Sequence, residues 1–166
     1  MINFIIIASF IFNWTESPTC VCQPISVTEN FDQSTIIFKG EIITIDTVKQ
    51  FDKDLPKGTF RELHLASIKV TKIYKGNASQ SIIKVISGAS YGDCGFDFVL
   101  GAYSIVYAKE RDYSVIDSTV LPMLDVNVSV RRFLYTDNCD RTTSQIVKED
   151  ALLSKLLRLR NIQRKN

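Results

Sequence analysis

Four cysteines limit the possible folds of this chain more than any other feature of its sequence. They stand at Cys20, Cys22, Cys94 and Cys139. An even number of cysteines in a small protein of an oxidising compartment predicts a set of disulfides. A bridge between Cys20 and Cys22 would close a loop too small for ordinary disulfide geometry, so each of them is expected to pair with a distant cysteine. Two pairings remain open, and each bridge would contribute up to about 4 kcal/mol of stability.

Zinc ligation by the four thiolates is the alternative use of these cysteines. Structural zinc sites usually take their ligands from two close pairs. This chain has one close pair, Cys20 and Cys22, and two single cysteines far along the sequence. The spacing therefore favours disulfides, and we expect no intrinsic metal site.

The segment before the first cysteine has the pattern of a secretory signal peptide. An apolar run over Ile2–Phe12 is followed by a short polar stretch, with Ser17 and Thr19 at the small-residue positions of a cleavage site. The run is shorter than the about 20 apolar residues of a membrane-spanning helix. Because no Lys or Arg precedes it, a buried N-terminal strand or a retained anchor is the alternative. On the signal hypothesis residues 1–19 are removed, the chain begins at Cys20, and the protein is extracellular, or periplasmic or at the cell surface in a bacterium.

The composition is that of one ordinary folded domain. The chain has 166 residues, of which 45% are hydrophobic and 23% charged, and we find no repeat or low-complexity linker. We therefore expect a single domain over residues 20–166. The net charge of +2 is the balance of 20 basic and 18 acidic residues, so nucleic acid is not an expected partner. No membrane span is expected either.

Helix signals stand near the two ends of the predicted domain. Ser26 and Glu29 form a capping box, which predicts a short helical turn ending near Phe31. After Cys139, apolar residues recur at helical spacing and predict a helix over residues 143–161.

Residues typical of β-strands fill most of the sequence between these helices. The stretches predicted to be extended are residues 36–45, 61–74, 82–86, 98–108, 113–116 and 120–134. Gly40 stands where the first strand would bulge or bend into a barrel corner, and loops are expected over residues 50–58 and 87–95. A succession of strands followed by one helix predicts a mainly β fold, a closed or nearly closed antiparallel barrel with a C-terminal α-helix packed against it.

No group of residues in the sequence supports catalysis. Gly88-Ala89-Ser90-Tyr91-Gly92 matches the G-x-S-x-G pattern of serine hydrolases, but that elbow joins a strand to a helix and needs a later histidine. Here the loop leads into a predicted strand, and the only histidine, His64, comes earlier. We find no zinc-protease, phosphate-loop or dinucleotide motif. We therefore predict a protein that is not an enzyme and needs no cofactor.

Two triplets have the pattern of acceptors for N-linked glycans. They are Asn77-Ala78-Ser79 and Asn127-Val128-Ser129. They are acceptors only in a eukaryotic secretory pathway, and such triplets also arise by chance.

The most informative motif is Cys20-Val21-Cys22-Gln23-Pro24, directly after the predicted cleavage site. Further short motifs follow it: Ile36-Ile37-Phe38-Lys39-Gly40, Ile73-Tyr74-Lys75-Gly76, Asp93-Cys94-Gly95, Gly101-Ala102-Tyr103 and Cys139-Asp140-Arg141-Thr142. In their order and spacing these motifs resemble the tissue inhibitors of metalloproteinases and the wider netrin-like modules. Together they span nearly the whole of the predicted mature chain.

This resemblance implies a fold, a disulfide pairing and a function. The fold would be a five-stranded OB-like barrel, with bridges from Cys20 to Cys94 and from Cys22 to Cys139. The function would be that of a secreted inhibitor of zinc metalloproteinases. A catalytic zinc keeps an open coordination position, and the free α-amine and carbonyl oxygen of Cys20 would chelate the metal there. An α-amine with a pKa near 8 has a usable neutral fraction at physiological pH.

The resemblance also implies a ridge that contacts the protease. Its residues would be Cys20, Val21, Cys22, Gln23 and Pro24, joined by Ser90, Tyr91, Gly92 and Asp93. Val21 would enter the specificity pocket of the protease, a position where the family usually has Thr or Ser. The family's third disulfide and second cysteine-rich domain have no counterpart in this sequence. A non-inhibitory netrin-like module that binds another extracellular protein is therefore the alternative, and in either case we expect a monomer.

Overall fold

A computed structural model describes residues 20–51, 60–89, 94–112 and 132–164. Several predictions fall on the other parts of the chain and lie outside the described residues. They are the signal segment 1–19, most of the 50–58 loop, the ridge residues Ser90, Tyr91, Gly92 and Asp93, the extended residues within 113–131, and the acceptor Asn127.

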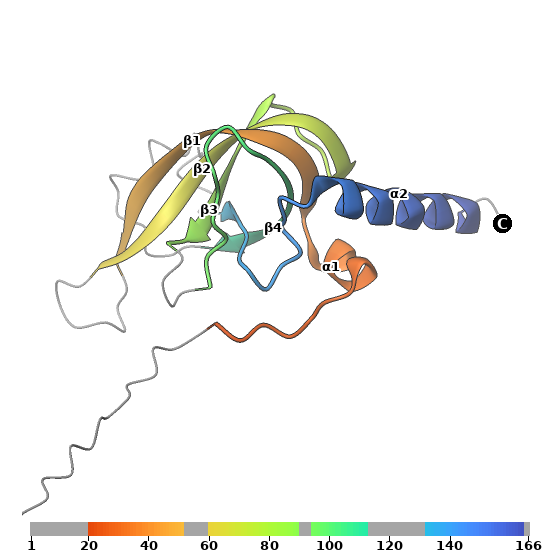
Figure 1. The fold of residues 1–166 in the computed structure, drawn as a ribbon, viewed down its shortest axis with the longest axis horizontal. Helices are drawn as coiled ribbons and strands as arrows, with labels where there is room; N and C mark the ends of the chain where they lie inside the picture. The colour runs from red at the N-terminus through yellow and green to blue at the C-terminus, as the bar shows by residue number, and fades with distance from the viewer. Residues whose placement is uncertain (1–19, 52–59, 90–93, 113–131, 165–166) are drawn as a thin grey trace, which may run out of the picture.

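Five strands and two helices make up the described structure (Figure 1). In chain order they are α1 (Val27–Gln33), β1 (Ile36–Phe51), β2 (Phe60–Lys75), β3 (Ile82–Gly88), β4 (Tyr103–Asp112), β5 (Arg132–Tyr135) and α2 (Ile146–Gln163). The strands form one sheet that closes into a barrel in the order β1-β2-β3-β5-β4. The prediction of a mainly β fold with a short N-terminal helix and a C-terminal helix is confirmed.

The two longest strands, β1 and β2, form a hairpin that bends where Gly40 permits it. The register of this pair shifts between Lys39 and Gly40. A Cβ atom added at Gly40 would lie 2.7 Å from the carbonyl oxygen of Lys69. Because the two backbones approach this closely, only glycine fits there without a shift of the neighbouring strand. The register shift agrees with the predicted bulge at Gly40.

The ring is closed by two different kinds of pairing. β4 runs antiparallel to both β1 and β5. β3 and β5 are instead parallel and join at a single residue pair, Ile86 with Tyr135. The prediction of a wholly antiparallel barrel was thus wrong at this seam, where the carbonyl oxygen of Ile86 also accepts a hydrogen bond from the Thr136 N–H at 3.0 Å.

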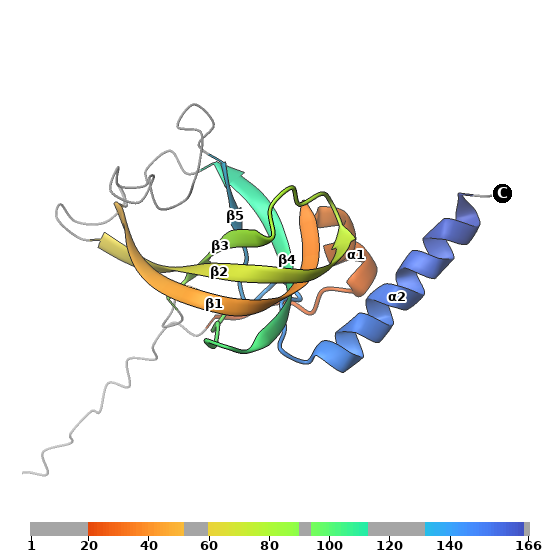
Figure 2. The ribbon, with the colours of Figure 1, turned by 90° about the horizontal axis from the view of Figure 1, so that it is seen from above.

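Both faces of β1 are buried, which explains its nearly continuous apolar start. Phe38 belongs to the apolar cluster that contains β2 and β3 residues, while Ile37 belongs to a second cluster with Tyr107 of β4. Neighbouring residues of a strand point to opposite faces. The second cluster also contains Phe31 of α1 and Leu153 of α2, so both helices cover the outside of this part of the sheet (Figure 2).

The two helices begin for different reasons. At α1 the Oγ atom of Ser26 accepts a hydrogen bond from the Glu29 N–H at 3.1 Å, so the predicted capping is confirmed. No side chain caps α2, which begins at Ile146, three residues after the predicted start. Its position is set by packing instead, since Leu153 is completely buried.

Strand β4 begins later than predicted. We expected an extended stretch from Phe98, but Phe98 lies in a loop, residues 99–102 form a turn, and β4 starts at Tyr103. In this turn Gly101 has a φ of +76°, and the Ala102 N–H donates to the carbonyl oxygen of Val99 at 3.0 Å. Phe98 is buried because it packs into the main apolar cluster of the barrel, with the ring of Phe96 edge-on beside it at a centroid distance of 5.0 Å. Its apolar character therefore reflects loop packing rather than a strand.

Candidate functional site

Two disulfides fix the N-terminal segment of the described chain against the barrel. Cys20 is bridged to Cys94 and Cys22 to Cys139, with Cα atoms 5.2 and 4.9 Å apart. This is the pairing that the resemblance implies. Val21 lies between the two bridged residues and is 86% exposed. The result is an extended piece of backbone that presents one apolar side chain to solvent from between two covalent anchors.

The two bridges lie side by side. The Sγ atom of Cys20 is 3.6 Å from that of Cys22 and 3.9 Å from that of Cys139. In the part of the chain that the structure describes, Cys20, Cys94 and Cys139 are the one group of side chains close enough to share a metal ion. All four cysteines are oxidised, and the thiolate rather than the disulfide sulfur is the metal ligand. The bridged protein therefore has no ligand set here for the zinc alternative.

The loop that carries Cys139 is organised by Asp137. Its Oδ1 atom accepts hydrogen bonds from the N–H groups of Cys139 at 2.9 Å and Asp140 at 3.0 Å. The Asn138 N–H donates to the carbonyl oxygen of Cys94 at 2.7 Å. The segments that hold the partner cysteines of both bridges are thus hydrogen-bonded to each other.

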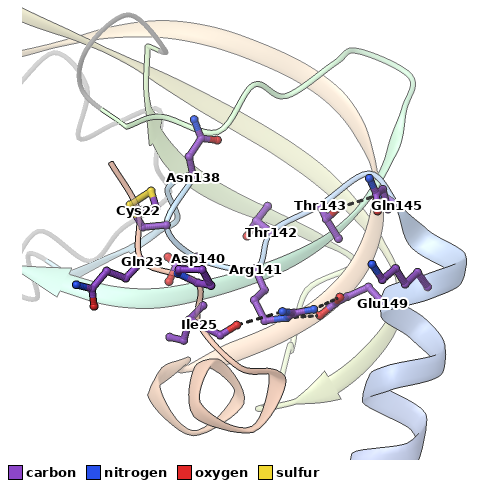
Figure 3. A pocket seen from close by; sticks show the side chains of 13 residues that line it. Cys22, Gln23, Ile25, Asn138, Asp140, Arg141, Thr142, Thr143, Gln145 and Glu149 are labelled. Carbon is purple, nitrogen blue, oxygen red and sulfur yellow. Dashed lines mark hydrogen bonds and ion pairs between the residues drawn. A yellow bond between two sulfur atoms is a disulfide. The ribbon is translucent and has the colours of Figure 1, made fainter. Parts of the chain in front are cut away.

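Arg141 joins the N-terminal segment to the barrel and to α2. Its Nη1 atom donates to the carbonyl oxygen of Ile25 at 3.1 Å, and its Nε and Nη2 atoms donate to the carboxylate of Glu149 at 2.8 and 2.6 Å (Figure 3). The hydroxyl of Tyr107, on β4, donates to the same carboxylate at 2.5 Å. Paired guanidinium and carboxylate groups of this geometry are among the stronger polar contacts in proteins.

Burial sets the electrostatics of this cluster. Glu149 is 4% exposed, so its charge depends on the groups that surround it. Hydrogen bonds to Glu149 raise the pKa of Arg141 above its ordinary value. Burial, reinforced by the hydrogen bond to Glu149, raises the pKa of Tyr107. Arg141 therefore stays charged and Tyr107 stays neutral across the physiological range, and the cluster is a fixed structural support.

A second buried carboxylate ties α1 to the same loop. Asp140 accepts a hydrogen bond from the side chain of Asn30 at 3.2 Å and forms an ion pair with Lys109 at 2.6 Å. Asn30 lies on α1, Lys109 on β4 and Asp140 next to Cys139. Three separate elements thus meet directly behind the bridge from Cys22 to Cys139.

A cavity of about 360 Å³ lies between the N-terminal segment and the start of α2 (Figure 3). Its walls are mostly polar and include Gln23, Asn138, Thr143, Gln145 and Lys148. Three of the four charged groups in its walls are paired: Arg141 with Glu149, and Asp140 with Lys109. The fourth, Lys148, is exposed. This arrangement supports the segment above it and has no nucleophile paired with a general base.

The structure brings together half of the predicted ridge. Cys20, Val21, Cys22, Gln23 and Pro24 form one continuous segment, beside Cys94 and Cys139. The other part of the ridge lies outside the described residues: Ser90, Tyr91, Gly92 and Asp93. Their place in the ridge therefore stays a prediction, and so does the conclusion that Ser90 is not a hydrolase nucleophile. His64 lies in β2 and, within the described ranges, belongs to no group of potential metal ligands.

No role was predicted for Arg141, Glu149 or Tyr107, although Arg141 is part of one of the family-like motifs. Arg141 and Glu149 lie on a loop and on a helix, and Tyr107 comes from β4. Arg141 and Glu149 are eight positions apart, on either side of the start of α2, and this separation matches no known sequence motif for an ion pair. Only the folded arrangement makes the group visible.

No protein-family model matches this chain, and none of the curated proteins searched matches it. Neither helix of the described part is long and apolar enough to cross a membrane.

Proposed function

We propose that the protein is a secreted inhibitor of zinc metalloproteinases that acts through the backbone of Cys20. The observation that supports this most strongly is the exposed Val21 held between two bridged cysteines. Removal of residues 1–19 would free the α-amine of Cys20. That amine and the carbonyl oxygen of the same residue would replace water at the open position of the protease zinc.

The fixed geometry of this segment supports the proposal energetically. A flexible peptide loses conformational entropy when it enters a cleft, and a segment that is already ordered loses less. Here the two disulfides fix Cys20 and Cys22, while the contact from Arg141 to the Ile25 carbonyl oxygen holds the end of the segment. Val21 is left free to enter an apolar specificity pocket.

The strand order is a second support. A five-stranded ring in the order β1-β2-β3-β5-β4, with one parallel contact between β3 and β5, is compatible with the OB-like barrel that the resemblance implies. Folds of this kind carry many unrelated functions, so the fold agrees with the proposal without deciding it.

The test is an inhibition assay with a chain that carries one additional residue before Cys20. The mature protein should inhibit zinc metalloproteinases, and the extended protein should not, because its α-amine is displaced while both bridges remain. A Lys155→Ala variant is the control, since it changes an exposed side chain of α2 outside the predicted ridge and keeps the amine. Equal inhibition by the extended and the mature protein would overturn chelation by Cys20.

An intact-mass measurement on secreted protein tests the premise independently. A mass that equals the chain from Cys20 onward, less the four thiol hydrogens, supports both processing and bridging. A mature chain that begins at any other residue would leave no free amine on Cys20 and would remove the inhibitor mechanism.

The second candidate is a non-inhibitory netrin-like module that binds another extracellular protein. The surface of α2 favours it, because three apolar side chains there are largely uncovered: Val147 is 87%, Leu159 52% and Ile162 59% exposed. This candidate predicts no inhibition of any zinc metalloproteinase by correctly processed protein. It also predicts that one added residue before Cys20 leaves partner binding unchanged.

A further inference from the structure

A groove of about 580 Å³ lies on another part of the barrel surface. It has no lining residue in common with the polar cavity at the N-terminal segment. Its apolar walls come from β1, β3 and β5 and include Ile43, Ile82, Phe133 and Leu134. Ile43 is 36% and Ile82 is 40% exposed. Apolar side chains gathered in an open groove commonly mark a surface that another molecule or chemical group covers.

The acceptor triplet Asn77-Ala78-Ser79 forms part of the wall of this groove. It lies in the turn between β2 and β3, directly after Gly76, whose φ of +81° directs the chain away from β2. Ala78 packs against the main apolar cluster, while Asn77 and Ser79 are exposed. The partly buried Ala78 therefore holds Asn77 at the surface beside the groove.

We propose that Asn77 carries an N-linked glycan when the chain passes through a eukaryotic secretory pathway, and that its first sugars lie over the groove. The groove begins at the attachment point, so the occupant is covalently placed beside its site. A glycan is bulky and solubilising, and the exposed position of Asn77 accommodates it without loss of packing. This proposal needs secretion but does not depend on protease inhibition.

The attachment reaction is balanced by a donor that the secretory pathway supplies. The Nδ2 atom of Asn77 attacks the anomeric carbon of an oligosaccharide linked to a lipid pyrophosphate. A carbon–nitrogen bond forms, the carbon–oxygen bond to the pyrophosphate breaks, and the lipid pyrophosphate leaves with the electron pair. The amide nitrogen loses one proton to a base of the transferase. The hydroxyl of Ser79 completes the triplet that the transferase recognises.

Peptide mapping of protein secreted by cultured eukaryotic cells tests the attachment. The peptide that contains Asn77 should carry a series of sugar masses, which treatment with peptide N-glycosidase removes, leaving Asp at that position. Asn77→Gln and Ser79→Ala should each abolish this series, and Ser79→Thr, which keeps the triplet, should retain it. An unmodified Asn77 in the secreted protein would overturn the proposal, whatever the inhibition assay shows.

Binding of a dye that fluoresces on apolar surface tests the position of the glycan. Enzymatic removal of the glycan from folded protein should raise dye fluorescence several-fold, and Asn77→Gln protein should match it. Adding Ile82→Ser to Asn77→Gln should lower the fluorescence again, because the exposed apolar wall is lost. Equal fluorescence with and without the glycan would show that the groove is not its resting place.

Discussion

The N-terminal segment and the C-terminal half of α2 are held in opposite ways. Residues 20–26 have no regular secondary structure, yet two disulfides and a hydrogen bond from Arg141 to the carbonyl oxygen of Ile25 attach them to the barrel. The last turns of α2 are regular helix but extend past the barrel (Figure 2), attached by Arg160, which pairs with Asp32 and stacks on Phe31. In this molecule regular secondary structure and tight attachment therefore do not coincide.

This difference teaches where a binding edge can be built. An extended segment leaves backbone groups available to a partner, whereas a helix uses its own groups internally. Such a segment needs attachment from outside to remain ordered. The Cys20–Ile25 segment has that attachment, which is why we place function there rather than on the more regular α2.

Removing the bridge between Cys22 and Cys139 should have the largest effect. The bridge closes a separation of 117 residues, so Cys22→Ser combined with Cys139→Ser should lower the free energy of unfolding by about 4 kcal/mol. Denaturant titration measures this loss. Amide hydrogen exchange in residues 22–26 should also become faster, and unchanged exchange there would contradict the idea that the bridge orders the segment.

Separating Arg141 from Glu149 should have the next largest effect. Arg141→Leu leaves the carboxylate of Glu149 buried without its cation and should cost about 3 kcal/mol of unfolding free energy. The double variant with Glu149→Leu should recover most of this loss, because it removes the uncompensated charge. Lys148→Leu, an exposed neighbour, is the control and should change the stability little. A large loss that the double variant does not recover would mean that the cluster acts through packing.

Much of the fold could be predicted from the sequence because its signals are local. The capping box at Ser26 needs only residues within one turn, and the strands appear directly as runs rich in apolar and β-branched residues. The start of β4 could not be predicted, because Phe96 and Phe98 have the composition of a strand but pack together within a loop. The parallel contact between β3 and β5 was also missed, since strand direction depends on how distant segments meet.

The site divides along the same line. Chemistry alone left two cysteine pairings open, and only the resemblance distinguished them. The support from Arg141, Glu149 and Tyr107 was not predicted, because a loop, a helix and a strand contribute one residue each. Contacts between residues of different helices, strands and loops could therefore not be predicted from the sequence.

Asp150, on the barrel side of α2, allows a smaller test of attachment that depends on pH. It accepts hydrogen bonds from Lys72 at 2.7 Å and from the Tyr74 hydroxyl, and the contact with Lys72 is the main reason that the pKa of Asp150 is lowered. A carboxylate with a lowered pKa stabilises the fold above its ordinary pKa, and this contribution is lost as pH falls through the lowered value. Asp150→Asn should therefore cost less than about 1 kcal/mol at neutral pH, since both partners are partly exposed.

Denaturant titrations of wild type and Asp150→Asn, repeated over a series of pH values from neutral down through the acid range, check this sign. The difference between the two proteins should shrink as the pH falls, because Asp150 becomes neutral in both the folded and the unfolded wild-type chain. A difference that grows with acid would contradict the proposed role of the Lys72 contact.

The smallest expected effect concerns the far end of α2 and sharpens the comparison most directly. Arg160 pairs with Asp32 at 2.7 Å, but the side chain of Asp32 is 57% exposed, so solvent and salt screen the pair. Arg160→Ala should cost about 0.5 kcal/mol in a double-mutant cycle with Asp32→Asn.

Amide exchange in the Arg160→Ala protein should increase in the last turns of α2 and stay unchanged in residues 20–26, because the two regions are attached independently. Increased exchange in both regions would show that α2 and the N-terminal segment open together, and the distinction between a covalently held edge and a loosely held helix would then no longer hold.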